Sequence, residues 1–216
     1  MFNTITYKPK MKHTKGGLKS FARLWHLMLP LTAMACFQGM STEESTIAYK
    51  EIPYPTPNVA PDSVNEVLGI ILHHTALPSV EYALAELTRP RGVSSHCVID
   101  TNGTRYILAP PTAVTFHAGK SVLNGREKCN AFTIGVEFQG NTVETPLTDN
   151  QIQSGVEYLL PIIREYHIPL SNIVTHQMVR DSFMVAFPNH PCKDKVDITR
   201  PEYERVMAAL KGALGE

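Results

Sequence analysis

Several features of other protein classes are missing from this sequence of 216 residues. It has no excess of basic residues, since 20 Lys and Arg balance 20 Asp and Glu, which argues against a protein that binds nucleic acid through clustered positive charge. Its four cysteines show no Cys-x-x-Cys spacing, which disfavours a structural zinc knuckle. It also has no internal repeat and no low-complexity tract. The length suits one domain with a buried core plus an appendage.

The N-terminal region has no acidic residue before position 24 and carries six basic residues. The apolar run that follows, "LWHLMLPLTAMAC" at 24–36, is shorter than the roughly 20 residues that a membrane-spanning helix needs. A basic region, an apolar run and small residues at Ala33 and Ala35 are typical of a secretory signal. We therefore expect residues 1–36 to direct export to the periplasm or cell envelope.

Cys36 allows a second interpretation of this segment, because a cysteine after small residues can be the lipid-attachment site of a bacterial lipoprotein. The chain would then be attached to a membrane through the lipid. A basic tail without a targeting role is the alternative to both interpretations. In an exported protein two of the three other cysteines could pair, and the sequence does not indicate which of Cys97, Cys129 and Cys192 these would be.

Residues 37–63 are predicted to be a linker, because "IPYPTPNVAPDS" contains four prolines and favours an extended chain. The folded domain is expected over 64–216. Apolar patterning and turn residues predict its elements. These are strands at 67–73, 132–138 and 172–176, a hairpin around Asn102-Gly103, and helices at 80–87, 148–166 and 199–214.

Two of the predicted helices begin with the same pattern of capping residues. Thr148 is followed by Gln151, and Thr199 by Glu202, which is the spacing of a capping box. The alternation of strands and helices predicts an α/β domain, in which a central mixed β-sheet is flanked by helices.

Polar side chains lie at the ends of three predicted strands. His73 and His74 end the first, His176 ends the strand at 172–176, and Glu137 is close to the end of the strand at 132–138. Since successive side chains along a strand point to opposite faces, His73 and His74 must have different roles. Two histidines and one carboxylate would satisfy a catalytic zinc site, which needs three protein ligands and an open position.

The third ligand of such a site is expected after His176, in "HPCKDKVDIT". Spacing alone does not choose among the four candidates, which are Asp197, Asp194, Cys192 and His190.

Six short segments occur in the order found in a known family. They are "ILHHTA", "SSHCVIDTNGTRY", "FHAG", "FTIGVEF", "VTH" and "KVD". Together they resemble the zinc-dependent N-acetylmuramoyl-L-alanine amidases of type 2, a family that includes phage lysozyme-type amidases and peptidoglycan recognition proteins. The resemblance covers about residues 64–212. It implies one zinc ion and hydrolysis of the amide bond between N-acetylmuramic acid and L-alanine in peptidoglycan or muropeptides.

The resemblance also implies roles for individual residues. Matched position by position, His73, His176 and Asp197 would be the metal ligands. Glu137 would be the catalytic acid/base, and Lys195 would add positive charge where the oxyanion forms.

Further histidines fall in the segments that carry the resemblance. His117 and Ala118, in "FHAG", match residues that line the substrate groove, and we assign His117 either there or to a position behind a ligand. His96 is expected to have a structural role or to contact substrate. His74 is expected to support the strand from the opposite face.

The sequence departs from the family pattern at two places. Asp197 is followed by Ile198 and Thr199 instead of Pro-Gly, and 21 positions separate His176 from Asp197, about twice the usual interval. "DSFMVAFPNHP" therefore looks like an insertion in a loop that lines the cleft, and it keeps Cys192 open as a third ligand. The alternative function is a non-catalytic peptidoglycan-binding module on the same fold, and a third hypothesis is a toxin or effector delivered to another cell.

Overall fold

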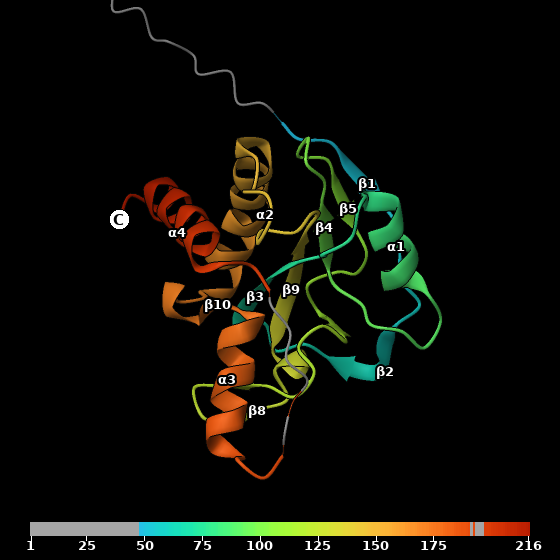
Figure 1. Cartoon of the computed structure of the whole chain (residues 1–216), viewed down its shortest axis with the longest axis vertical. Helices are drawn as coiled ribbons and strands as arrows, with labels where there is room; N and C mark the ends of the chain where they lie inside the picture. Colours follow the sequence, from blue (N-terminus) through green and yellow to red (C-terminus); the bar gives the residue numbers. More distant parts are fainter. Residues whose placement is uncertain (1–47, 191, 193–196) are drawn as a thin grey trace, which may run out of the picture. The chain divides into compact units, whose positions relative to one another are not determined.

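The computed structural model describes residues 48–190, 192 and 197–216. At its centre is a six-stranded sheet in the order β1-β5-β4-β9-β3-β10 (Figure 1). The strands in this order are Glu51–Pro53, Arg105–Ile107, Cys97–Ile99, Thr133–Phe138, Gly69–His74 and Ile173–Thr175. Only β4 and β5 pair antiparallel; the other neighbours are parallel. The predicted mixed sheet is therefore confirmed.

Two small antiparallel ribbons accompany the main sheet. Strand β2 (Val59–Val64) pairs with β6 (Ala113–Thr115), and β7 (Val122–Leu123) pairs with β8 (Arg126–Glu127). Short 3-10 turns lie at η1 (Cys129–Ala131) and η2 (Leu170–Asn172).

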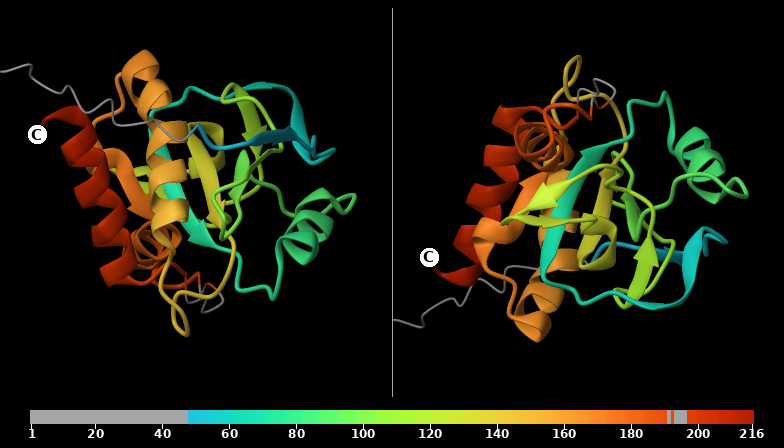
Figure 2. Two further views of the ribbon diagram at one scale, coloured as in Figure 1. Left: turned by 90° about the horizontal axis from the view of Figure 1, so that it is seen from above. Right: turned by 90° about the horizontal axis from the view of Figure 1, so that it is seen from below.

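Helices cover both faces of the sheet. Helices α2 (Asp149–Tyr166) and α4 (Arg200–Leu214) pack side by side over one face, as Figure 2 shows. Helices α1 (Val80–Thr88) and α3 (His176–Ala186) lie on the other face, over β4 and over β3 and β10 respectively. No described helix is both long and apolar enough to cross a membrane.

The two central strands explain this layering. Every residue of β3 and β9 is buried, which is typical of strands covered on both sides. Ile134, Val136 and Phe138 share one face of β9, where they join the core under α2 and α4. The opposite face of β9 carries Gly135 and Glu137 and looks toward α1 and α3.

The caps of the two long helices differ. The predicted capping box of α2 is present, because Thr148 accepts a hydrogen bond from the Gln151 backbone and Gln151 bonds back to the Thr148 N–H. The box predicted for α4 is wrong, since Thr199 makes no side-chain cap bond. The Glu202 carboxylate instead accepts from the Leu147 N–H at 2.9 Å and so ties the start of α4 to the segment before α2.

The hairpin between β4 and β5 forms where it was predicted, with a different turn. Of the Asn102-Gly103 pair, only Gly103 has a positive φ, at 84°. The Gly103 N–H donates to the Asp100 carbonyl at 2.8 Å. The connection is therefore a type I turn followed by a left-handed glycine rather than a two-residue turn.

The segment predicted as a linker, 37–63, belongs to the domain over its described part. Strand β1 pairs with β5, and β2 pairs with β6. Between them Thr56 and Asn58 are buried and donate hydrogen bonds to the Leu87 and Arg89 carbonyls at 2.7 and 2.8 Å. Prolines suit these edge strands, where a backbone N–H is not needed on the outer side. Residues 37–47 and the predicted export segment 1–36 lie outside the described residues.

The insertion predicted as a loop is also different in the structure. Helix α3 continues to Ala186, with the Thr175 hydroxyl accepting from the Met178 N–H at 3.2 Å as an N-cap. Its buried apolar residues Val179 and Phe183 are four positions apart and lie on one side of the helix. The first part of the insertion is therefore helical, because Phe183 continues the apolar side that Val179 begins before the insertion.

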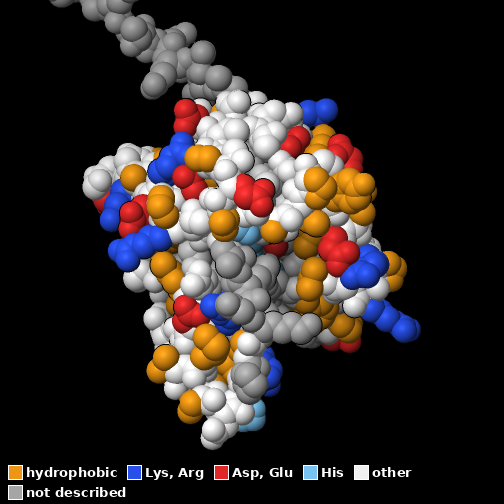
Figure 3. All heavy atoms as spheres, viewed as in Figure 1, with side chains coloured by type: hydrophobic (Ala, Val, Ile, Leu, Met, Phe, Trp, Pro, Cys, Tyr) orange, Lys and Arg blue, Asp and Glu red, His pale blue; other side chains and the backbone are white. Residues whose placement is uncertain are grey.

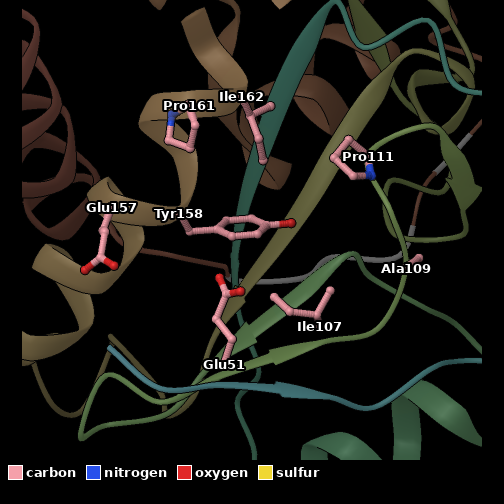
Figure 4. A pocket seen from close by; sticks show the side chains of 8 residues that line it. All are labelled: Glu51, Ile107, Ala109, Pro111, Glu157, Tyr158, Pro161 and Ile162. Carbon is pink, nitrogen blue, oxygen red and sulfur yellow. The ribbon is translucent and has the colours of Figure 1, made fainter. Parts of the chain in front are cut away.

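A cavity of about 260 Å³ lies between α2 and the β1–β5 edge of the sheet (Figure 4). Tyr158 extends across it, and among the described residues its buried hydroxyl has no hydrogen-bond partner. Burial raises the pKa of this hydroxyl well above its usual value. The cavity is on the α2 face, away from the strand ends that carry the histidines.

Candidate metal centre and active site

Three side chains from separate parts of the chain meet at the end of β3. The Nδ1 atoms of His73 and His176 lie 3.3 and 3.2 Å from the same oxygen, Oδ2 of Asp197. The three potential ligand atoms are all within 4.8 Å of one another. Parallel pairing of β3 with β10 sets this geometry, because Leu72 is in register with Thr175 and a histidine follows each of these two residues. His73 and Asp197 are buried, whereas the His176 side chain is 15% exposed and marks the open side.

The two oxygens of Asp197 have different surroundings. Oδ1 accepts hydrogen bonds from the backbone N–H groups of His74 at 2.8 Å and Ile198 at 2.9 Å. These bonds hold the carboxylate so that Oδ2 faces the two imidazoles. Two neutral imidazoles and one carboxylate are a donor set that suits a divalent transition metal, and zinc in particular. The residues present therefore fit the metal that the sequence predicts.

Glu137 lies beside His73 on the neighbouring strand. The pairing of β3 with β9 places the two residues opposite each other on one face of the sheet. The side chain is largely buried, and among the described residues its Oε2 has no hydrogen-bond partner. Such a carboxylate is available to a reactant at the metal position.

Glu137 also borders a cavity of about 320 Å³ beneath α1. The cavity is otherwise lined by Thr75, Leu77, Ala83, Glu86, Leu87 and Val93. Figure 3 shows hydrophobic side chains gathered on the side of the molecule that carries α1. Tyr82 of α1 and Val93, which lines the cavity, are exposed. Glu137 therefore has a largely apolar cavity beside it.

His74 points to the opposite face, as predicted. It is buried, and its Nδ1 accepts from the Thr142 N–H at 3.1 Å and lies 2.8 Å from the Thr142 hydroxyl. The Thr142 oxygen in turn accepts from the Thr199 N–H at 2.9 Å. His74 therefore ties the end of β3 to the segment that follows Asp197.

The residues predicted to line the groove are buried instead. Ala118 and His96 have no exposed surface, and His117 is 7% exposed. Ala118 packs among Ile71 and Val179 beneath the centre. His117 lies behind His73, with its Nδ1 3.2 Å from His73 Nε2, which is the second of the two positions expected for it. The assignment of His96 and Ala118 to the substrate groove stays a prediction, and the core packing that encloses them argues against direct contact with substrate.

Burial disfavours the charged form of both buried histidines. Burial lowers the pKa of His96 to about 4, and burial together with the nearby His73 lowers the pKa of His117 well below its usual value. His96 donates from Nε2 to the Ala113 carbonyl at 3.0 Å and accepts at Nδ1 from the Gly135 N–H at 3.0 Å. These hydrogen bonds support the structural role that was one of the two alternatives for His96.

The candidates for the third ligand differ in whether they are described and in whether they lie near the two histidines. Lys195 and Asp194 lie outside the described residues. His190 is exposed, Cys192 is partly exposed and not in a disulfide, and neither belongs to the metal-binding group found among the described residues. Cys97 and Cys129 are likewise free and buried. Among the described candidates, Asp197 alone joins the two histidines.

Sequence reasoning missed the contribution of Gly135. A Cβ at this position would lie 2.5 Å from Cγ of His117, so only glycine leaves room for the ring on this face of β9. The signal was present in "TIGVE", where Thr133, Gly135 and Glu137 alternate on the face that carries the site.

The family model for N-acetylmuramoyl-L-alanine amidases, Amidase_2, matches residues 63–194. The chain belongs to this family. The matched range contains His73, Glu137 and His176 and ends before Asp197, where the chain departs from the family spacing.

Characterised relatives agree with this membership. The chain is 41% identical over 102 residues to the 1,6-anhydro-N-acetylmuramyl-L-alanine amidase AmpD of Haemophilus influenzae, a match that covers 46% of this chain and 53% of that protein. It is 28% identical over 149 residues to AmpD of Escherichia coli, covering 60% of this chain and 80% of that protein. The chain thus spans about half the length of the Haemophilus relative.

Solved structures support the fold. A crystal structure of a selenomethionine AmpD derivative aligns with a TM-score of 0.58 at 24% identity, covering 75% of this chain and 94% of that one. The structure of a mutant endolysin from Bacillus subtilis aligns with a TM-score of 0.52 at 18% identity, covering 76% of this chain and 99% of that one. This amidase family fold is the one predicted from the sequence.

Proposed function

We propose that this family member is a zinc-dependent amidase, which hydrolyses the bond between N-acetylmuramic acid and L-alanine in peptidoglycan or its muropeptide fragments. The observation that carries the proposal is the convergence of His73, His176 and Asp197 next to Glu137. A peptidoglycan-binding module would need neither the buried carboxylate between two imidazoles nor the adjacent acid/base.

His73, His176 and Asp197 would hold the metal. When bound there, zinc supplies a Lewis acid that withdraws electron density from the oxygen atoms beside it. The buried N–H bonds to Asp197 keep one carboxylate oxygen directed at this position. The partly exposed His176 leaves one side of the centre open to substrate.

Glu137 performs the proton transfers of the proposed reaction. Its carboxylate takes a proton from the attacking water as the water oxygen bonds to the amide carbon, and it returns that proton to the alanine nitrogen as the carbon–nitrogen bond breaks. The products are a muramic acid carboxylate and a peptide with a free N-terminal alanine. For Lys195, which lies outside the described residues, we propose that its charge stabilises the oxyanion.

The test uses the full chain and a defined muropeptide, with products identified by mass spectrometry. We expect free muramyl sugar and an Ala-initiated peptide, lost with a chelator and restored by added zinc. The Glu137→Gln variant is the matched control, because it keeps the size of the side chain and removes its basicity. An uncut muropeptide after zinc loading would contradict the proposal, and retention of that intact muropeptide by the protein would favour the binding module.

For residues 1–36 we propose export to the periplasm or cell envelope, and lipid attachment at Cys36 is the second form that this export could take. The basic start, apolar run and small residues before Cys36 support this. Fractionation of cells that express the full chain tests it. Membrane association that is lost in Cys36→Ser would support lipidation, and a cytoplasmic, unprocessed chain would contradict export.

A further inference from the structure

A line of hydrogen bonds leads away from the metal centre behind His73. Nε2 of His73 lies 3.2 Å from Nδ1 of His117, and Nε2 of His117 lies 3.3 Å from the Thr133 carbonyl oxygen and 3.4 Å from the Thr133 hydroxyl oxygen. His73 and Thr133 have no exposed surface, and His117 has little. Because bulk water does not compete at such buried positions, the partners themselves determine where each proton lies.

Thr133 determines which atom donates and which accepts in each of these hydrogen bonds. Its carbonyl oxygen can only accept, and its hydroxyl proton is donated to the Cys129 carbonyl at 2.7 Å. Both oxygens near Nε2 of His117 are therefore acceptors, and the His117 proton must be on Nε2. In the neutral ring Nδ1 then carries a lone pair, so it accepts the proton of His73 Nε2.

The consequence appears on the other side of the His73 ring. With its proton on Nε2, a neutral His73 directs the Nδ1 lone pair toward Asp197 Oδ2, 3.3 Å away, where His176 Nδ1 also points. We propose that His117 is a positioning residue, which fixes the tautomer and orientation of His73 so that Nδ1 is the atom that binds the metal. This inference rests on the proposed zinc centre and specifies how one of its ligands is prepared.

Packing and hydrogen bonds from neighbouring segments hold the His117 ring in one position. The ring lies against Gly135, where a Cβ would come within 2.5 Å of Cγ and 2.7 Å of Nδ1. On another side His96 meets it edge to face, with the ring centroids 5.9 Å apart. The backbone N–H groups of His117 and Ala118 both donate to the side chain of Asn130, at 3.1 and 2.8 Å, which holds the segment in place. These contacts hold the ring next to His73.

The inference is tested with zinc affinity, measured on the full chain by competition with a chromophoric chelator. His117→Leu removes the acceptor, and we expect zinc to bind about 10- to 100-fold more weakly, as for other partners of metal-binding histidines. His117→Asn keeps an acceptor at the Nδ1 position and should recover most of the affinity. Gly135→Ala leaves the imidazole in place chemically but displaces its ring, and it should weaken zinc binding in the same direction as His117→Leu.

A control separates positioning from general destabilisation. Leu159→Ala opens a cavity in the core on the α2 side, far from the ligands in the fold, and should lower the melting temperature while leaving zinc affinity unchanged. If His117→Leu does not fold, the nitrogen NMR shifts of the native histidine rings decide the question. The zinc-loaded chain should show His73 bound through Nδ1 and protonated at Nε2, and His117 protonated at Nε2.

Two results would overturn the inference. One is a folded His117→Leu that binds zinc as tightly as the native chain, and the other is His73 bound through Nε2. A chain that binds zinc with the expected pattern but leaves muropeptides intact contradicts the proposed function alone. A chain that cleaves muropeptides with a zinc affinity that is indifferent to His117 contradicts this inference alone.

Discussion

Replacement of Asp197 separates metal binding from folding, because its two oxygens have different partners. Oδ1 accepts from two buried backbone N–H groups, and Oδ2 faces the two imidazoles. Asp197→Asn keeps an amide oxygen for the backbone and places an NH₂ group, which does not bind zinc, opposite the histidines. Asp197→Ala removes both functions.

The expected magnitudes follow from these bonds. Each buried N–H that is left without an acceptor costs about 1–3 kcal/mol, so the metal-free Asp197→Ala variant should lose about 2–6 kcal/mol of unfolding free energy. Asp197→Asn replaces charged acceptors by neutral ones at a cost of about 1 kcal/mol per bond, or about 2 kcal/mol together. Both variants should lose tight zinc binding. Cys192→Ser should retain it.

Urea unfolding in the presence of a chelator measures the first effect, and chelator competition measures the second. The chelator matters because bound zinc would itself stabilise the native chain. Equal stability of the Asn and Ala variants would refute the assignment of Oδ1 to the backbone. Native zinc affinity in Asp197→Asn, or its loss in Cys192→Ser, would refute Asp197 as the third ligand.

Three further variants test other parts of the account. Glu137→Gln should lower kcat by about 10²- to 10⁴-fold and leave the zinc affinity native, because only the proton transfer is removed. Muropeptide turnover measures the first effect and chelator competition the second. Native turnover in this variant would refute the role of Glu137. His73→Ala should abolish zinc binding, whereas His74→Ala should keep much of it and lower thermal stability, and equal zinc loss in both would overturn that division. Tyr158→Phe should change the unfolding free energy by about 1 kcal/mol or less, since the hydroxyl has no partner among the described residues. Tyr158→Ala should lower it by about 3–5 kcal/mol, as other truncations of large aromatic side chains do. If urea unfolding shows a large loss of unfolding free energy in Tyr158→Phe, the hydroxyl does have a hydrogen-bond partner.

Elements with a strong local pattern could be predicted from the sequence. The capping box of α2 and the strand around Thr133–Phe138 are signalled by residues close together in the sequence, and both predictions are confirmed. The pattern around Glu202 looks the same as that around Gln151, yet its carboxylate serves Leu147, which is 55 positions away. Local spacing does not distinguish a carboxylate that caps its own helix from one that tethers another segment.

The candidate site shows the same limit. The predicted ends of the strands indicated where His73, Glu137 and His176 lie, because parallel neighbouring strands end at the same edge of a sheet. The depth of a residue below that edge could not be predicted. His117 and Ala118 follow β6 in a segment that looks like a groove wall, but η1 and β9 enclose it on both sides. Burial of this kind depends on contacts between distant segments, which periodicity does not contain.

X-ray absorption at the zinc edge, on the full chain loaded with one equivalent of zinc, tests the central claim most directly. The structure predicts a shell of nitrogen and oxygen ligands at about 2.0–2.2 Å, two of them imidazoles, with no sulfur. Asp197→Asn should lose this shell at the same zinc concentration. A sulfur ligand at about 2.3 Å that disappears in Cys192→Ser would contradict the His73–His176–Asp197 centre.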